Sequence, residues 1–123
     1  MKVHLTRREL DVMAVVWAQG SATVGEVRDG LPEKLAYTTV LTVLRGLDAK
    51  GYLRHEEDGR AFRYFPLIEP GQAADALLPR LVHKIFSGSR ELLLARLVAD
   101  EDITPEELRK MKEHLEQRLG EVE

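Results

Sequence analysis

The dipeptide Asp58-Gly59 lies between two runs, residues 52–57 and 60–65, in which apolar and polar residues alternate. Asp-Gly suits a two-residue turn in which both central positions take a positive φ, so this pattern is the strongest short-range signal for a β-hairpin. We therefore predict two antiparallel strands joined at residues 58 and 59.

Such a turn also predicts the register of the strands. Arg54 is then directly opposite Arg63, and Glu57 is opposite Arg60. Two arginines that face each other repel, unless an anion such as a DNA phosphate lies between them. The alternatives are a different register, or an ion pair between Arg54 and Glu56.

Three helices are predicted before the hairpin. Thr6 with Glu9, and Thr23 with Glu26, form capping boxes that begin the first two helices. A third helix is expected at residues 36–50. Apolar residues at helical spacing give the inner faces: Leu10, Met13, Val16 and Trp17; Val24, Val27 and Leu31; and Val40, Val43, Leu44 and Leu47.

Three short helices followed by a hairpin is the order of a winged helix-turn-helix. In that fold the third helix enters the major groove of DNA and the hairpin, or wing, lies along the neighbouring backbone. The predicted fold class is mainly α with a small β-hairpin wing. We expect a winged helix-turn-helix DNA-binding domain at residues 1–68 and a helical dimerisation region at residues 69–123.

The outer face of the predicted third helix carries Thr38, Thr39, Thr42 and Arg45. Exposed threonines are mediocre helix formers, so a purely structural helix would more often carry Glu, Lys or Ala there. Threonine can hydrogen-bond base edges or phosphates and contact thymine methyls, and arginine can reach guanine. The alternative is that Thr38 and Thr39 only cap the start of the helix.

Charge is unevenly distributed along the chain, whose net charge is −3. Residues 1–68 carry ten Lys and Arg against nine Asp and Glu, whereas residues 69–123 carry eight against twelve. An anion is therefore expected to bind the N-terminal part.

Other classes of protein find less support. The chain has no cysteine, so disulfides and thiolate metal sites are excluded, and we expect no metal or other cofactor. Its four histidines are scattered, which argues against an enzyme. The sequence contains no apolar run long enough to predict membrane insertion or a secretory signal, so we expect a cytoplasmic location. A winged helix used for protein interaction is the remaining alternative.

The C-terminal region is predicted to be helical. One helix begins near Gln72 and is either kinked at Pro79 or divided there. A second follows at residues 90–99, and Thr104 begins the last with a capping box. Their apolar stripes exceed what so short a segment can bury, so we predict dimerisation through Leu77, Leu81, Ile85, Leu93, Leu97, Leu108, Met111 and Leu115.

Several stretches together resemble the penicillinase-repressor family, which includes the methicillin-resistance repressors. They are LTRRELDVM at residues 5–13, LAYTTVLTVLR at 35–45, KGYL at 50–53, DGRA at 58–61 and YFP at 64–66, together with Trp17. The resemblance covers nearly the whole chain. It implies a bacterial, dimeric winged-helix repressor of transcription that binds operator DNA at inverted repeats, typically with a TACA/TGTA core.

The resemblance also implies roles for individual residues. Its groove-facing recognition residues fall on Thr38, Thr39, Thr42 and Arg45, with Leu41 as an apolar neighbour. The backbone contact of the wing falls on Arg60. Charge and geometry add five further candidates for contact with the DNA backbone: Arg7, Arg8, Lys50, Arg54 and Arg63.

Regulation differs between branches of this family. In the antibiotic-responsive branch, a membrane sensor-protease system triggers cleavage of the repressor at an Asn-Phe bond in the dimerisation region. Arg96-Leu97 occupies that place here, a departure that weakens the expectation of this partner and this trigger. A copper-responsive branch uses a cysteine metal hook, which this chain lacks.

Overall fold

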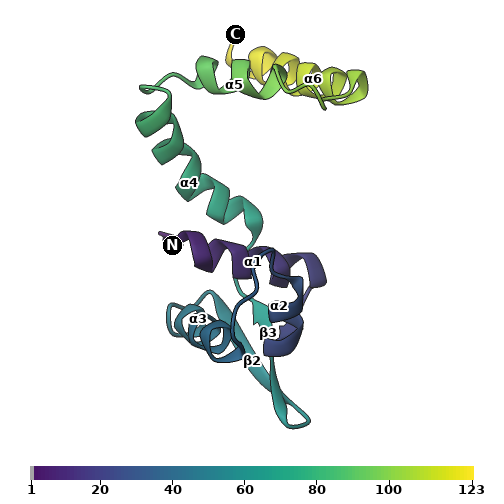
Figure 1. Ribbon diagram of the computed structural model, residues 1–123. Coiled ribbons are helices and arrows are strands. Elements are labelled where there is room, and N and C mark those ends of the chain that lie inside the picture. Colours follow the sequence, from purple (N-terminus) through teal and green to yellow (C-terminus); the bar gives the residue numbers. More distant parts are fainter. Residues whose placement is uncertain (1) are drawn as a thin grey trace. The chain divides into compact units, whose positions relative to one another are not determined.

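The computed structural model describes residues 2–123 (Figure 1). The chain forms two compact units, Met1–Leu78 and Pro79–Glu123. The elements in order are α1 (Arg7–Gln19), β1 (Ala22–Thr23), α2 (Val24–Gly30), α3 (Tyr37–Ala49), β2 (Leu53–Asp58), β3 (Ala61–Pro66), α4 (Pro70–Ile85), α5 (Arg90–Val98) and α6 (Pro105–Val122).

Local capping determines where α1 and α2 begin. The Thr6 hydroxyl accepts a hydrogen bond from the amide of Glu9 at 3.2 Å, and the Glu9 carboxylate accepts one from the amide of Thr6 at 2.8 Å. Thr23 and Glu26 repeat this arrangement at 3.2 and 2.9 Å. Both predicted capping boxes are therefore confirmed.

Helix α3 begins after Ala36, which makes no side-chain cap, so Thr38 and Thr39 lie inside the helix. The alternative in which these threonines only cap it is wrong. The helix ends at Lys50, and Gly51 takes a φ of 83°, a backbone conformation that disfavours any residue with a Cβ.

The core of the N-terminal unit lies between α1, α2, α3 and the sheet. Its largest fully buried side chains are Met13, Leu44, Leu47, Leu53, Ile68, Val12, Val16, Val27 and Val40. The three predicted apolar faces therefore point inward. Val12 and Val15 are also buried, which was not predicted. Helix α1 buries a wider face than the predicted stripe of four residues.

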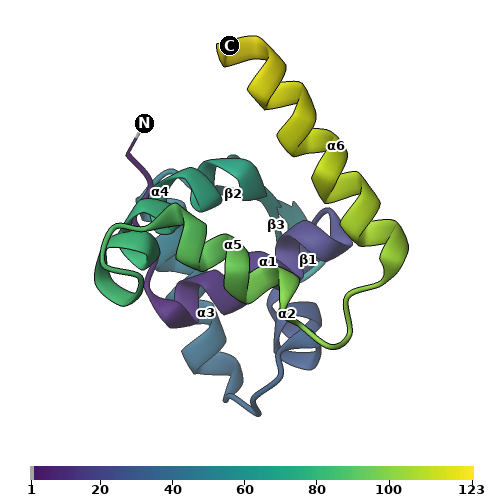
Figure 2. The ribbon, with the colours of Figure 1, turned by 90° about the horizontal axis from the view of Figure 1, so that it is seen from above.

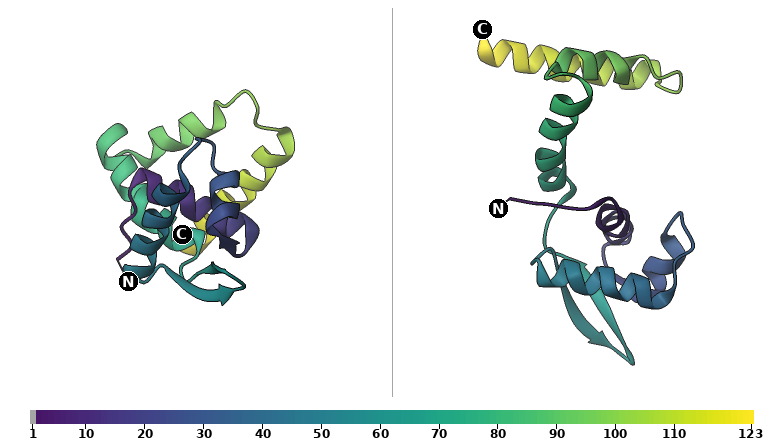
Figure 3. Two further views of the ribbon diagram at one scale, coloured as in Figure 1. Left: turned by 60° about the horizontal axis from the view of Figure 1, so that its bottom comes forward. Right: turned by 60° about the vertical axis from the view of Figure 1, so that its left-hand side comes forward.

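The sheet has three strands in the order β1-β3-β2, with both pairs antiparallel. The sequence predicted only the last two. Strand β1 consists of Ala22 and Thr23, which pair with Tyr64 and Arg63 of β3. Strands β2 and β3 form the wing, whose tip projects beyond the helices of the N-terminal unit (Figures 1 and 3).

The predicted register of the wing is wrong. Asp58 pairs with Ala61, so the turn is made by Gly59 and Arg60. Gly59 has a φ of 66°, and Arg60 has no positive φ, which places glycine at the first central position of the turn. As a result Arg54 is opposite Phe65 rather than Arg63.

The elements of the C-terminal part also differ in detail from prediction. Helix α4 begins at Pro70 and continues through Pro79 as one helix, so the division into two helices is wrong. Thr104 accepts a hydrogen bond from the amide of Glu107 at 3.1 Å, which is one half of the predicted capping box. The first part of α4 packs on the N-terminal core through Ala73, so this unit extends beyond the predicted boundary at residue 68.

The unit Pro79–Glu123 has no buried core. None of its residues is buried, and α5 and α6 have no buried side chain. In Figure 2, α6 leaves the loop after α5 and runs as a single helix to the C-terminus. Within residues 2–123, no helix combines the length and apolarity that crossing a bilayer requires.

An ion pair joins the start of α1 to the end of α3. Lys50 Nζ lies 2.8 Å from Glu9 Oε1, the oxygen that also accepts the Thr6 amide. Burial alone raises the pKa of Glu9, but hydrogen bonds from Lys50 and Thr6 outweigh it, so the pKa of Glu9 lies below its usual value of 4.5. The folded unit therefore favours the charged carboxylate.

We predict that Glu9→Gln lowers the stability of the N-terminal unit at neutral pH by about 1 kcal/mol, since solvent screens the Lys50 side of the pair. A carboxyl with a lowered pKa stabilises the fold fully above its unfolded pKa, and the effect is lost as the pH falls through the folded pKa. The variant should therefore show a flatter loss of stability in acid.

Urea unfolding between pH 3 and 7, followed by fluorescence of the single tryptophan, Trp17, measures this effect. Trp17 suits the purpose because its indole donates to the Ile68 carbonyl at 2.8 Å inside the same unit. Glu57→Gln, at an exposed wing carboxylate, is the control. If the free energy of unfolding of Glu9→Gln falls as steeply with decreasing pH as that of the wild type, the prediction is wrong.

Candidate nucleic-acid interface

Helix α3 presents a polar face to solvent. Its inner face is fixed because Val40, Leu44 and Leu47 are fully buried. The opposite side therefore points outward and carries most of the predicted base-reading residues, but Leu41 packs against the core. Thr38, Thr42 and Arg45 are exposed, and Thr39 and Leu41 are partly exposed.

Thr42 makes a hydrogen bond that orients its side chain. Its hydroxyl donates to the carbonyl oxygen of Thr38, one turn earlier, at 2.9 Å. The donor is thereby used, and the lone pairs of the oxygen stay open to solvent. Thr42 can accept a hydrogen bond from a base amino group, and its methyl group can contact an apolar base edge.

The C-terminal part of α3 is attached to the wing. His55 Nδ1 of β2 hydrogen-bonds Asp48 Oδ2 of α3. The His55 ring meets Phe62 edge-on at 5.1 Å between centroids and lies 5.8 Å from Tyr64. Burial and the charge of Asp48 raise the pKa of the Tyr64 phenol, and Arg45 opposes them. These contacts restrain the wing relative to the outer face of α3.

Four of the six predicted backbone-binding cations have carboxylate partners within the chain. The pairs are Arg8 with Glu33 at 3.8 Å, Lys50 with Glu9 at 2.8 Å, Arg54 with Glu56 at 2.6 Å, and Arg63 with both Glu26 and Asp58 at 3.0 Å. Both alternatives to facing arginines are thus found, since the register differs from the predicted one and Arg54 pairs with Glu56. Arg54 also lies over the Phe65 ring, 4.2 Å from its centroid.

Three arginines of the N-terminal unit are available to an external anion. Within residues 2–123, no carboxylate forms an ion pair with Arg7, Arg45 or Arg60. Arg45 projects from α3, and Arg60 lies in the turn at the tip of the wing. The two elements that a winged helix presents to DNA each carry one unpaired guanidinium.

Sequence reasoning missed Tyr37, the first residue of α3. Its side chain is 45% exposed, and the guanidinium carbon of Arg28 in α2 lies 5.9 Å from the ring centroid. The first residues of a recognition helix are the ones that meet base edges. Its place directly before the two threonines was a usable signal, but no apolar or charge pattern distinguished it.

The predicted dimerisation residues are largely accessible to solvent. Ile85 is 67% exposed, and Leu97 and Leu115 are each 53% exposed. The bond between Arg96 and Leu97 lies in the last turn of α5. The remaining predicted residues are partly exposed or exposed: Leu77, Leu81, Leu93, Leu108 and Met111.

Comparison with known proteins agrees with this geometry. The penicillinase repressor of Bacillus licheniformis is 26% identical over 116 residues, which cover 93% of this chain and 91% of that protein. The transcriptional regulator BlaI of Mycobacterium tuberculosis is 35% identical over 94 residues, 73% of this chain and 68% of that protein.

A solved structure is similar to part of this chain. It is the solution structure of monomeric BlaI from Bacillus licheniformis in complex with the blaP half-operator. Its TM-score is 0.50 and its identity 32%, over 58% of this chain and 90% of that chain.

The family model described as Penicillinase repressor matches residues 5–117, which is most of the sequence. The matched residues include the first five helices, the wing and most of α6. The chain therefore belongs to the penicillinase repressor family, whose members are winged-helix repressors of transcription.

Proposed function

We propose that this chain represses transcription by binding a palindromic operator as a homodimer, with α3 in the major groove and the wing on the DNA backbone. One observation carries the proposal: Thr38, Thr42 and Arg45 are exposed on α3, and within residues 2–123 no carboxylate forms an ion pair with Arg60 in the turn of the wing. The related BlaI that was solved with a half-operator supports it. Repression then follows from occupation of the promoter in the cytoplasm, where bacterial DNA lies.

The recognition face combines two kinds of contact with the bases. Thr38, Thr39 and Thr42 offer hydroxyl groups and methyl groups, whereas Leu41 packs against the core, so we assign it no base contact. Arg45 reaches farther and can bind a guanine with two parallel hydrogen bonds. Such contacts discriminate between sequences, because a wrong base leaves a polar group without its partner.

Backbone contacts are assigned first to Arg7 and Arg60, the predicted cations that form no ion pair within the part of the chain that the structure describes. An arginine that has no carboxylate partner loses nothing within the protein when a phosphate replaces water beside it. Arg8, Lys50 and Arg54 would each exchange a carboxylate for a phosphate, so we assign them a smaller share of the binding free energy.

A second copy of the chain is the proposed partner of the unit Pro79–Glu123. A segment in which no residue is buried does not provide enough apolar burial to fold by itself. Its exposed apolar side chains, among them Ile85, Leu115 and Leu119, provide the surface that a two-fold partner would cover. A two-fold dimer also matches the symmetry of an inverted repeat.

We predict that Arg45→Ala reduces discrimination between an inverted-repeat duplex with a TACA/TGTA core and a scrambled duplex by about 1–3 kcal/mol per half-site, with a smaller loss for Thr39→Ala. Arg60→Ala should instead weaken binding to both duplexes. It should also lower the slope of log affinity against log salt by about 0.9 per half-site.

Fluorescence anisotropy at several salt concentrations measures these effects. Arg80→Ala, at an exposed arginine of the C-terminal unit, is the matched control for Arg60. If the wild type binds both duplexes equally, sequence-specific repression is wrong. An unchanged salt slope for Arg60→Ala removes the wing from the backbone contact.

We further predict that Leu115→Glu weakens dimerisation roughly tenfold or more, since each copy loses the burial of one leucine and gains a charge at the interface. Sedimentation velocity across a dilution series measures the dissociation constant. Gln117→Glu, at an exposed position of the same helix, controls for the added charge. A monomeric wild type, or equal behaviour of both variants, contradicts the proposed dimer surface.

A further inference from the structure

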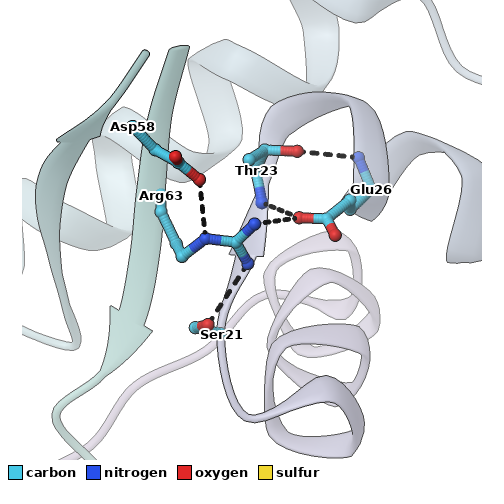
Figure 4. Close-up of polar contacts among 5 residues, drawn as sticks. All are labelled: Ser21, Thr23, Glu26, Asp58 and Arg63. Carbon is cyan, nitrogen blue, oxygen red and sulfur yellow. Dashed lines mark hydrogen bonds and ion pairs between the residues drawn. The ribbon is translucent and has the colours of Figure 1, made fainter.

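The guanidinium of Arg63 is held by three groups (Figure 4). Its Nε donates to Asp58 Oδ2 at 3.0 Å, and Nη1 donates to Ser21 Oγ at 3.3 Å. Nη2 lies 3.0 Å from Glu26 Oε1. Every nitrogen of the side chain therefore has a partner, and each partner lies in a different element or loop of the N-terminal unit.

Glu26 has a second role in the same cluster. Its Oε1 also accepts the backbone amide of Thr23 at 2.9 Å, which is one half of the capping box of α2. The Thr23 amide and hydroxyl lower the pKa of Glu26, and Arg63 lowers it further. The carboxylate is thus charged at neutral pH. The one atom Glu26 Oε1 binds both the start of α2 and the returning strand of the wing.

The cluster braces the wing along its length. Arg63 lies in β3 beside Thr23 of β1, and Asp58 is the last residue of β2, next to the turn. The side chain of Arg63 therefore links the far end of β2 to the N-terminus of α2. A hairpin that projects from its domain has few other contacts near its tip, so this link limits how far the wing can swing.

The charge balance of the cluster disfavours a phosphate. Two carboxylates surround one guanidinium, so the three side chains together carry a net negative charge. The Arg63 side chain is 29% exposed and forms two ion pairs. Arg60, in contrast, forms no ion pair within the described residues. An incoming phosphate would have to displace the carboxylates that bind Arg63, whereas Arg60 has no ion pair to give up within the described residues.

We propose that Arg63 is a positioning residue for DNA binding: with Glu26 and Asp58 it holds the wing at the angle at which Arg60 meets the DNA backbone, and it does not itself bind phosphate. The inference rests on the proposed function. It replaces the expectation that Arg63 contacts the backbone directly.

The two roles of Arg63 predict different effects of the same substitutions. If Arg63 positions the wing, Arg63→Ala weakens operator binding roughly three- to tenfold through the Arg60 contact, so it has little further effect on affinity or salt slope in a chain that already carries Arg60→Ala. If Arg63 binds phosphate itself, Arg63→Ala lowers the slope by about a further 0.9 per half-site in that Arg60→Ala chain.

Glu26→Gln gives results of opposite sign. Under the positioning role it releases Arg63 from α2 and weakens binding, although it removes a negative charge. Under the phosphate role it frees Arg63 and tightens binding. Glu57→Gln, at a wing carboxylate without an ion pair in the described chain, shows what removal of a charge does alone.

The experiment uses the full chain and the inverted-repeat duplex, with affinity measured by anisotropy across a salt series. Thermal unfolding followed by Trp17 fluorescence identifies a variant that fails to fold. Arg63→Lys, which keeps the charge but lacks the planar fork that reaches several partners, separates the roles when Arg63→Ala is unstable. Lysine restores affinity and slope at a phosphate site, but it restores little at the brace.

We expect Arg63→Ala and Glu26→Gln each to weaken binding, with little further loss when either is added to Arg60→Ala, and with an Arg63→Ala/Glu26→Gln double variant no weaker than either alone. A further fall in slope when Arg63→Ala is added to Arg60→Ala, together with tighter binding by Glu26→Gln, overturns the positioning role while Arg60→Ala still supports operator binding. A wild type without preference for the inverted repeat overturns the proposed function, and the inference with it.

Discussion

The burial of one face of α3 is the constraint on which the rest of the interface depends. Val40, Leu44 and Leu47 are fully buried, so the helix cannot rotate about its axis without exposing them. That fixed rotation points Thr38, Thr42 and Arg45 at solvent. Polar contacts at the end of the helix, from Lys50 to Glu9 and from Asp48 to His55, then hold its position along the axis.

Local signals in the sequence predicted the helices, but they did not predict pairings between residues far apart in the sequence. Thr6 and Thr23 bond residues three positions away, so their capping boxes could be read directly. Strand β1 has two residues and therefore shows no period, and its pairing with β3 depends on the tertiary fold. The register error had a local cause, since either Asp58-Gly59 or Gly59-Arg60 could form the turn.

The candidate site was predicted in the same uneven way. The exposed face of α3 follows from helical spacing, so Thr38, Thr42 and Arg45 lie where expected. Whether a cation is available to DNA depends on the carboxylates near it, and these come from distant parts of the sequence. The partner of Lys50 lies 41 positions away, and nothing in the wing alone indicated that Arg63 pairs with Glu26.

Glu26 Oε1 bonds both the cap of α2 and the wing. The wing therefore cannot be exchanged independently of α2. A wing without an arginine at position 63 would leave Glu26 bonded only to the cap of α2, and a loss of Glu26 would affect both elements. Helix start and wing therefore behave as one module, and a chimaeric repressor with altered backbone contacts should exchange the segment containing Ser21 and Glu26 together with β2 and β3.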